Sequence, residues 1–407
     1  MDNCVIPQGY KATALGIIPQ EWEVMRLGDI VSITSGESPS LYHLKAEGKY
    51  PYVKVEDLNN CEKYQESSRE YSDDNNTTIK AGSIIFPKRG ASILNNKVRI
   101  AAKDIQMDSN MMAITPHTAI VDTEFLYIRI LHERLYRIAD TSSIPQINNK
   151  HIIPYKIAVP PLAEQRKIAE VLGVWDEAIE KQARLIEKLA LRKRGLMQRL
   201  LSAKLRLPGF SEPWKEHKIA DLFSPINDTN DGREHIPMTI SAKSGFISQK
   251  DKFDRVIAGD SLQRYILLKK GDFAYNKGNS NLYEMGCIYH LNEESALVPF
   301  VYICFRSKGS VNIDFYSQFF INHGLDRQLK KIITSGARGD GLLNVDKKDF
   351  FALNVPYPTI EEQTPIAEVL TAADREIELA KEKLDRLRRQ KRGLMQQLLT
   401  GKKRVKY

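Results

Sequence analysis

Apolar side chains recur in alternating steps of three and four residues along two stretches of the chain, at 168–200 and 366–398. This spacing aligns the apolar side chains along one side of a helix and is typical of the a and d positions of a coiled coil. The pattern therefore predicts two long helices. Their predicted pairing or docking positions are Ile168, Leu172, Ile179, Ile186, Leu189 and Leu196 in the first helix, and Ile366, Leu370, Ile377, Leu384, Leu387 and Leu394 in the second.

The two stretches are copies of one another. Ile-Ala-Glu-Val-Leu stands at 168–172 and again at 366–370, an offset of 198 residues (366 minus 168), and the same offset relates Lys193 to Lys391, which interrupt the two apolar patterns. These lysines either extend outward along their apolar stems or mark where the helices part. The segments that precede each copy diverge far more, which suggests a shared scaffold that carries two different recognition domains.

Charge along the predicted helices indicates how they pair. Prolines stand before each helix and glycines after it, while acidic residues are concentrated at the start and basic residues at the end. In an antiparallel pair, each basic end meets the acidic start of the other helix, and each end also suits its own helix dipole. Only this arrangement gives the repeat a two-fold axis, so we predict an antiparallel coiled coil with pseudo-two-fold symmetry. The basic clusters are interpreted as solvated helix ends in preference to DNA contacts.

The two globular segments mix strand and helix patterns. Short apolar runs predict strands at 83–86, 97–100, 265–268 and 350–353, separated by turns rich in Gly, Asn and Ser. One helix is expected late in each segment, at 124–139 in the first and at 317–332 in the second. The predicted fold class is therefore α+β, with two globular domains separated by two long helices.

Composition narrows the class of protein only modestly. The chain has 407 residues, of which 42% are hydrophobic and 27% charged, with a net charge of +9, as expected for a globular protein that could bind nucleic acid. The longest nearly apolar run, 296–305, is about half of the ~20 residues that a membrane helix needs. Four scattered cysteines without C-x-x-C spacing exclude a zinc ribbon or disulfide scaffold and fit the cytoplasm.

Candidate DNA-binding loops occur at matching places in the two globular segments. Arg and Lys side chains can bind phosphate or guanine, and Asn and Gln can pair with adenine, although ordinary exposed turns have the same composition. The candidate residues are Lys88, Arg89, Asn95, Asn96, Lys97, Gln146, Asn148 and Asn149 in the first segment, and Asn276, Lys277, Asn279, Asn281 and Arg338 in the second.

The sequence contains no recognisable catalytic motif. The phosphate-binding, dinucleotide-binding, zinc-protease and hydrolase signatures do not occur, and the histidines show no metal-ligand spacing. The strings nearest to an amino-methyltransferase tetrapeptide, at 159–162 and 355–358, lack the polar first residue that would bind the amino group. We therefore predict no catalytic residue and no metal site, and a binding protein rather than an enzyme.

The chain resembles the specificity subunit of type I restriction–modification systems over nearly its whole length. The residues that carry the resemblance are Val-Pro-Pro-Leu-Ala-Glu-Gln at 159–165, Pro-Thr-Ile-Glu-Glu-Gln at 358–363, Gly-Ser-Ile-Ile-Phe-Pro-Lys-Arg-Gly at 82–90 and Thr-Ser-Gly at 334–336. Thr-Ser-Ser at 141–143 departs from the more usual Ser-Gly pair. The resemblance implies target-recognition domains at 1–158 and 208–356, a spacer and docking helix at 159–207, and a distal helix with a basic tail at 357–407.

The resemblance also implies a function and a set of partners. Each target-recognition domain would read one half of a bipartite, asymmetric site in double-stranded DNA. The helices would dock two modification (methyltransferase) subunits, joined by restriction subunits that translocate DNA. S-adenosylmethionine, ATP and Mg would be bound by those partners and no cofactor by this chain. Two alternatives stay open: a DNA methyltransferase or nuclease with an unrecognised active site, and a coiled-coil scaffold for proteins only.

Overall fold

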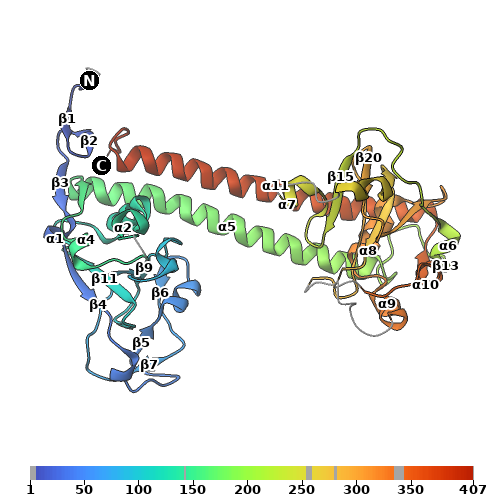
Figure 1. The fold of residues 1–407 in the computed structure, drawn as a ribbon. Coiled ribbons are helices and arrows are strands. Elements are labelled where there is room, and N and C mark those ends of the chain that lie inside the picture. Colours follow the sequence, from blue (N-terminus) through green and yellow to red (C-terminus); the bar gives the residue numbers. More distant parts are fainter. Residues whose placement is uncertain (1–5, 142–143, 254–258, 279–281, 334–342, 407) are drawn as a thin grey trace. The chain divides into compact units, whose positions relative to one another are not determined.

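The computed structural model describes residues 6–141, 144–253, 259–278, 282–333 and 343–406. The chain forms two compact units: unit 1 comprises Met1–Gln182 and Lys383–Tyr407, and unit 2 comprises Ala183–Glu382. Helices α5 (Leu162–Leu200) and α11 (Ile360–Leu399), green and red in Figure 1, each contribute one part to unit 1 and the other to unit 2. The two long helices predicted from the apolar spacing are therefore confirmed.

Unit 1 contains a five-stranded sheet in the order β4-β11-β8-β9-β6, antiparallel except for the parallel pair β6 and β9. Its strands are β4 (Val31–Ser35), β11 (Met111–Pro116), β8 (Ile84–Pro87), β9 (Arg99–Ala101) and β6 (Tyr64–Gln65). A smaller sheet has the order β10-β5-β7, and two further pairs are β1-β2 and β3-β12. Their bounds are β10 (Gln106–Met107), β5 (Tyr50–Val53), β7 (Tyr71–Ser72), β1 (Tyr10–Thr13), β2 (Gly16–Pro19), β3 (Glu23–Arg26) and β12 (Lys156–Val159).

The core of unit 1 joins the sheet to both long helices. Phe125 and Leu126 of α2 pack in one buried cluster with Leu172 of α5 and Leu398 of α11, and Figure 1 shows α2 lying against α5. The other helical segments of this unit are short. The bounds are α1 (Leu27–Ile30), α2 (Thr123–Glu133), α3 (Leu135–Ile138), α4 (Asn149–Ile152), η1 (Pro39–Leu41), η2 (Val55–Asn59) and η3 (Ala91–Ile93).

Unit 2 repeats this plan with a different second sheet. Its first sheet, β14-β21-β18-β19, has the order of β4-β11-β8-β9 in unit 1, and its second sheet has the order β16-β15-β20-β17. The strands are β14 (Phe223–Pro225), β21 (Ile303–Ser307), β18 (Phe273–Asn276), β19 (Cys287–His290), β16 (Gly245–Ser248), β15 (Ile236–Ser241), β20 (Ser295–Val298), β17 (Ile266–Lys269), and the pair β13 (Lys215–Lys218) and β22 (Asn354–Tyr357). The helices are α6 (Ile219–Leu222), α7 (Gln249–Phe253), η4 (Gly259–Arg264), α8 (Ile313–Ile321), α9 (Asp326–Ile332) and α10 (Lys347–Phe351).

Two of the predicted helices are each broken in two. The helix expected at 124–139 ends at Arg134, whose φ of 63° is left-handed, and resumes as α3. The helix expected at 317–332 is interrupted by His323, with φ 60°, and Gly324, where an added Cβ would lie 2.5 Å from the Phe319 ring. A left-handed residue ends a helix because its backbone cannot continue the ladder of hydrogen bonds.

The strand predicted at 350–353 is wrong. Phe350 and Phe351 end the short helix α10, which begins where the side chain of Asp346 accepts a hydrogen bond from the Lys348 N–H. Phe350 is fully buried and stacks on Tyr275, with ring centroids 5.2 Å apart. Burial of an aromatic ring stabilises a helix turn as well as it does a strand, so a short apolar run does not distinguish the two.

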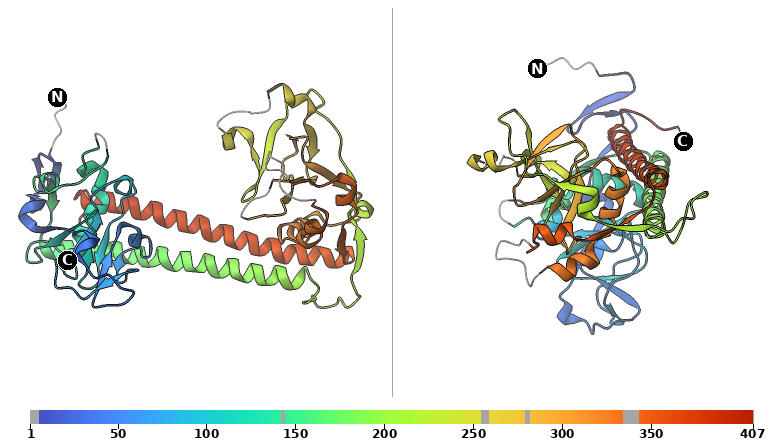
Figure 2. Two further views of the ribbon diagram at one scale, coloured as in Figure 1. Left: turned by 60° about the horizontal axis from the view of Figure 1, so that its bottom comes forward. Right: turned by 90° about the vertical axis from the view of Figure 1, so that its right-hand side faces the viewer.

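The long helices pair antiparallel within each unit. In unit 1, Asp176 near the start of α5 binds Lys391 near the end of α11. In unit 2, Lys193 Nζ lies 2.5 Å from Asp374 Oδ1, and the ends of the helices are again opposed (Figure 2). The two lysines that interrupt the apolar pattern therefore hold the helices together at equivalent positions. All twelve predicted pairing positions are buried or half-buried, and no helix of the described chain is both long and apolar enough to cross a membrane.

Candidate nucleic-acid interface

The two candidate loops of unit 1 lie together although more than forty residues separate them in sequence. The strand β8 ends at Pro87, and the following residues pair with the segment before α4: Ile147 N–H donates to Lys88 O and Gly90 N–H to Pro145 O, both at 2.8 Å. A β-bridge between Arg89 and Gln146 completes this pairing. The first unit thus places Lys88, Arg89 and Gln146 on one continuous piece of backbone structure.

Unit 2 has the corresponding arrangement. Lys277 follows β18 as Lys88 follows β8, and the Leu343 N–H donates to Lys277 O at 2.9 Å. In both units, therefore, the first residue after the equivalent strand accepts a backbone hydrogen bond from a segment that follows much later in the sequence. Asn279, Asn281 and Arg338 lie outside the described residues.

Several candidate side chains of unit 1 are available to a ligand. Arg89, Asn95, Asn148 and Asn149 are exposed, and Lys88 is half-buried. Burial and, to a lesser degree, the positive charge of Arg89 lower the pKa of Lys88. Since two adjacent cations repel each other, an anion placed between them would relieve this repulsion. The arrangement therefore suits a phosphate or the acceptor edge of a base.

Other candidates hold the loops in shape. The Asn96 side chain donates to Leu131 O at 3.0 Å and accepts from the Leu135 N–H at 2.9 Å, so it bridges the break between α2 and α3. Asn276 similarly donates to Ile240 O and accepts from the Gly278 N–H. Both carboxamides are engaged within the protein, and we no longer propose either for base contact. Lys97 donates to Asn59 Oδ1 at 2.6 Å.

A buried carboxylate anchors the start of each long helix, and sequence reasoning did not identify this role. Glu164 of α5 is fully buried and accepts the Trp22 indole N–H at 2.9 Å, while the Arg404 guanidinium donates to both of its oxygens at 2.6 and 2.9 Å. Residues from the two ends of unit 1 in the sequence thus meet on one carboxylate. This bond raises the pKa of Arg404 further, so its positive charge is secure.

Unit 2 contains the same cluster. Glu362 is 2% exposed and accepts from the Trp214 indole and from two nitrogens of Arg206. The exact recurrence of Glu-Gln in both copies of the repeat, and the less exact recurrence of the tryptophans, were the signals that could have revealed the two anchors. Neither arginine could be paired with its glutamate from the sequence, because each partner lies more than 150 residues away.

The glutamine that follows each anchor joins the long helix to the globular part of its unit. The Gln165 side chain donates to Pro160 O and accepts from the backbone N–H of Asp122, the N-cap residue of α2. Gln363 donates to Pro358 O and accepts from the N–H of Asn312, the N-cap of α8. In each unit a fully buried glutamine with satisfied hydrogen bonds therefore ties the globular part to the helix start, which favours a fixed orientation between them.

Comparison with known proteins agrees with this architecture. The family described as type I restriction modification DNA specificity domain matches residues 19–190 and 248–389. The MjaVIII specificity subunit of a type I restriction enzyme from Methanocaldococcus jannaschii is 24% identical, over 96% of this chain and 94% of that protein.

Solved structures share the fold. The S subunit of a type I restriction–modification system from M. genitalium has a TM-score of 0.54 at 17% identity, over 93% of this chain and 96% of that one. A chain from a structure of type I R-M complex assembly and conformational transition has a TM-score of 0.61 at 16% identity, over 94% and 99% of the two chains.

The chain is a member of a protein class that supplies DNA specificity without a catalytic site of its own. It belongs to the type I restriction–modification DNA specificity family, whose profile covers most of its length. This membership confirms the predicted resemblance, the α+β fold with two recognition domains and two long helices, and the non-enzymatic role. Among the described residues, no group of three His, Cys, Asp or Glu side chains could hold a metal ion.

Proposed function

We propose that the chain reads a bipartite, asymmetric sequence in double-stranded DNA, with one half-site for each unit. The observation that carries this proposal is the equivalent backbone pairing directly after equivalent strands, at Lys88 after β8 in unit 1 and at Lys277 after β18 in unit 2. The scaffold beneath the loops is repeated, whereas the side chains on them differ: Lys88-Arg89 in one unit corresponds to Lys277-Gly278 in the other, as counted from the strand ends. Two different readers on one scaffold explain an asymmetric site.

The long helices serve in this proposal as the spacer and as the dock for two modification subunits. The equivalent anchors and ion pairs of the two units support two equivalent docking sites. Gly195 and Gly393 are related by the repeat, and apart from the adjoining backbone of its own helix no atom lies within 4 Å of a Cβ added at either. Both positions therefore leave room for a partner helix. In this proposal the modification subunits bind S-adenosylmethionine and methylate adenine, and the restriction subunits bind ATP and Mg. The complex acts in the cytoplasm.

Exchange of one globular segment tests the two-reader proposal. We expect that replacing residues 20–158 by the equivalent domain of a relative changes only the half-site read by unit 1 and leaves the other half unchanged. Sequencing of methylated adenines in cells that carry the hybrid chain measures this result directly. A change in both halves, or in neither, would show that the units do not read DNA independently.

Replacement of the loop cations tests the site itself. Arg89→Ala and Lys277→Ala are expected to weaken binding to the native site by about 1–3 kcal/mol each if a bidentate base contact is lost. Lys103→Ala is the matched control, because Lys103 is exposed and follows β9 at the opposite end of the sheet from the candidate loops. Titration of the assembled complex on native and scrambled duplexes separates the outcomes: equal losses on both duplexes would assign the residue to phosphate, and no loss would remove it from the interface.

A further inference from the structure

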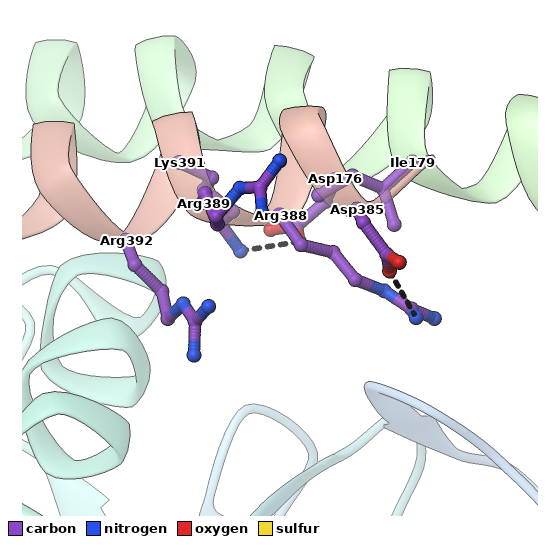
Figure 3. Close-up of a pocket in the computed structure, with 7 residues that line it drawn as sticks. All are labelled: Asp176, Ile179, Asp385, Arg388, Arg389, Lys391 and Arg392. Atoms are coloured by element: carbon purple, nitrogen blue, oxygen red, sulfur yellow. Dashed lines mark hydrogen bonds and ion pairs between the residues drawn. The ribbon is translucent and has the colours of Figure 1, made fainter. Parts of the chain in front are cut away.

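A basic groove runs along the end of α11 in unit 1. It is lined by Asp176 and Ile179 of α5 and by Asp385, Arg388, Arg389, Lys391 and Arg392 of α11. Figure 3 shows Arg388 and Arg392 extending from α11 on the side of the globular part of the unit. All three arginines are exposed, so they can reach a ligand without any rearrangement of the helices.

The carboxylates of the groove do not balance its cations. Lys391 is paired with Asp176, and Arg388 lies 3.8 Å from Asp385. No carboxylate of the described chain lies within ion-pairing distance of Arg389 or Arg392. Four cations therefore face two carboxylates, and guanidinium groups with free donors bind planar or tetrahedral oxyanions well.

The groove is repeated only in part. Subtracting the offset of 198 places Ala190, Leu191 and Arg194 where Arg388, Arg389 and Arg392 stand in the second copy. At a further position only unit 2 has a cation, and that cation is neutralised. Arg192 of unit 2 forms an ion pair with Glu376, whereas the residue of unit 1 that corresponds to Arg192 is Gln390. Two identical subunits that dock on a repeated scaffold need the same residues in both units, so Arg388 and Arg389, which have no basic counterpart, point to a different ligand.

The groove lies next to the proposed reading loop of unit 1. A second groove shares Asp176, Ile179 and Lys391 with the first and continues to Leu131 of α2. The carbonyl oxygen of Leu131 accepts the hydrogen bond from Asn96, within the loop that carries Arg89. DNA held by that loop would therefore bring its backbone toward the guanidinium groups of Arg389 and Arg392, which have no carboxylate partner in the described chain.

We propose that Arg388, Arg389 and Arg392 bind backbone phosphates of the DNA beside the half-site read by unit 1. This inference rests on the proposed function, since it requires that unit 1 holds DNA. Phosphate is present at every step of the duplex, so these contacts add affinity without adding sequence information. They also make the two units unequal: unit 1 holds its half-site with an additional, salt-dependent contribution, because unit 2 has no cation at the positions equivalent to Arg388 and Arg389.

The test compares two triple variants of the full chain assembled with its modification subunits. Arg388→Gln/Arg389→Gln/Arg392→Gln removes the groove cations, and Lys188→Gln/Arg194→Gln/Arg199→Gln removes three exposed cations from the end of α5. Both variants lose the same charge, and glutamine is a good helix former. The affinity for a duplex with the methylated site and for a scrambled duplex of equal length is measured at several salt concentrations.

The groove variant is expected to lose roughly tenfold or more in affinity on both duplexes at about 0.15 M salt. The slope of log affinity against log salt should become shallower by about 2–3, at about 0.9 per phosphate contact, while the methylated sequence stays the same. The control variant should change the slope by clearly less.

Two results would overturn the inference. Equal losses in the two variants would mean that only overall charge matters. A groove variant that fails to assemble, but whose assembled fraction binds DNA normally, would mean that the groove receives an acidic protein surface instead. A different result would contradict the proposed function itself: an unaltered complex that binds its methylated site no more tightly than the scrambled duplex.

Discussion

Arg404→Ala is expected to lower the free energy of unfolding of unit 1 by about 3–5 kcal/mol. The substitution removes the guanidinium from the Glu164 carboxylate, which is fully buried and keeps the hydrogen bond from the Trp22 indole. An uncompensated charge in the interior costs far more than the loss of an exposed ion pair, because water cannot reach the carboxylate to replace the guanidinium. The start of α5 and the core beneath it should loosen together.

Hydrogen exchange measured by mass spectrometry can assign this loss to one unit. For Arg404→Ala we expect faster exchange in α2 and in the start of α5, with unit 2 unchanged. For Arg206→Ala, which removes the partner of Glu362, we expect faster exchange in unit 2, with unit 1 unchanged. Arg166→Ala is the matched control, since Arg166 is exposed on the same helix turn; its effect should stay within about 0.5 kcal/mol. Similar losses for Arg404→Ala and Arg166→Ala would show that the buried anchor does not stabilise the unit.

The long helices could be predicted because their apolar spacing is repeated over many turns and occurs twice. Opposite charge at the two ends of each helix predicted the antiparallel pairing, and Asp176–Lys391 and Lys193–Asp374 show the charges meeting. In both cases the information lies in residues close together in sequence or related by one offset. Such patterns can be recognised in the sequence without knowledge of the rest of the fold.

The features that escaped prediction depend on partners far away in sequence. Arg134 ends a helix because its backbone is left-handed, a conformation held from outside by the Asn96 carboxamide. Glu164 looks like any early acidic residue of a helix until Arg404 is brought to it from the other end of the chain. Asn96 itself has the composition of a DNA-binding loop but hydrogen-bonds within the protein, since exposed and structural asparagines cannot be told apart by residue type.

Lengthening both helices is expected to lengthen the spacer between the two half-sites by one or two base pairs. The change is an insertion of four helix-forming residues after Arg184 in α5 and after Glu382 in α11, positions related by the repeat. Both insertion points lie between the ion pairs Asp176–Lys391 and Lys193–Asp374. Each unit therefore keeps its buried glutamate anchor and its own contacts between α5 and α11. Four residues shift the heptad pattern by a stutter, which a coiled coil tolerates by unwinding locally.

The expected size of the effect comes from matching two helical geometries. Four residues add about 6 Å of helix and rotate the part of the helix beyond the insertion by about 40°, whereas each base pair adds about 3.4 Å and turns the duplex by about 35°. The insertion therefore falls between one and two base pairs in both length and rotation, and the half-site sequences should stay the same because no loop has changed. Sequencing of methylated adenines reads the new spacer. An insertion of four residues in α5 alone is the control, because it unbalances the pair and should reduce activity instead of moving the spacer cleanly. A doubly lengthened chain that methylates the original site at full rate would show that its partner subunits, and not its own helices, set the distance between the two readers.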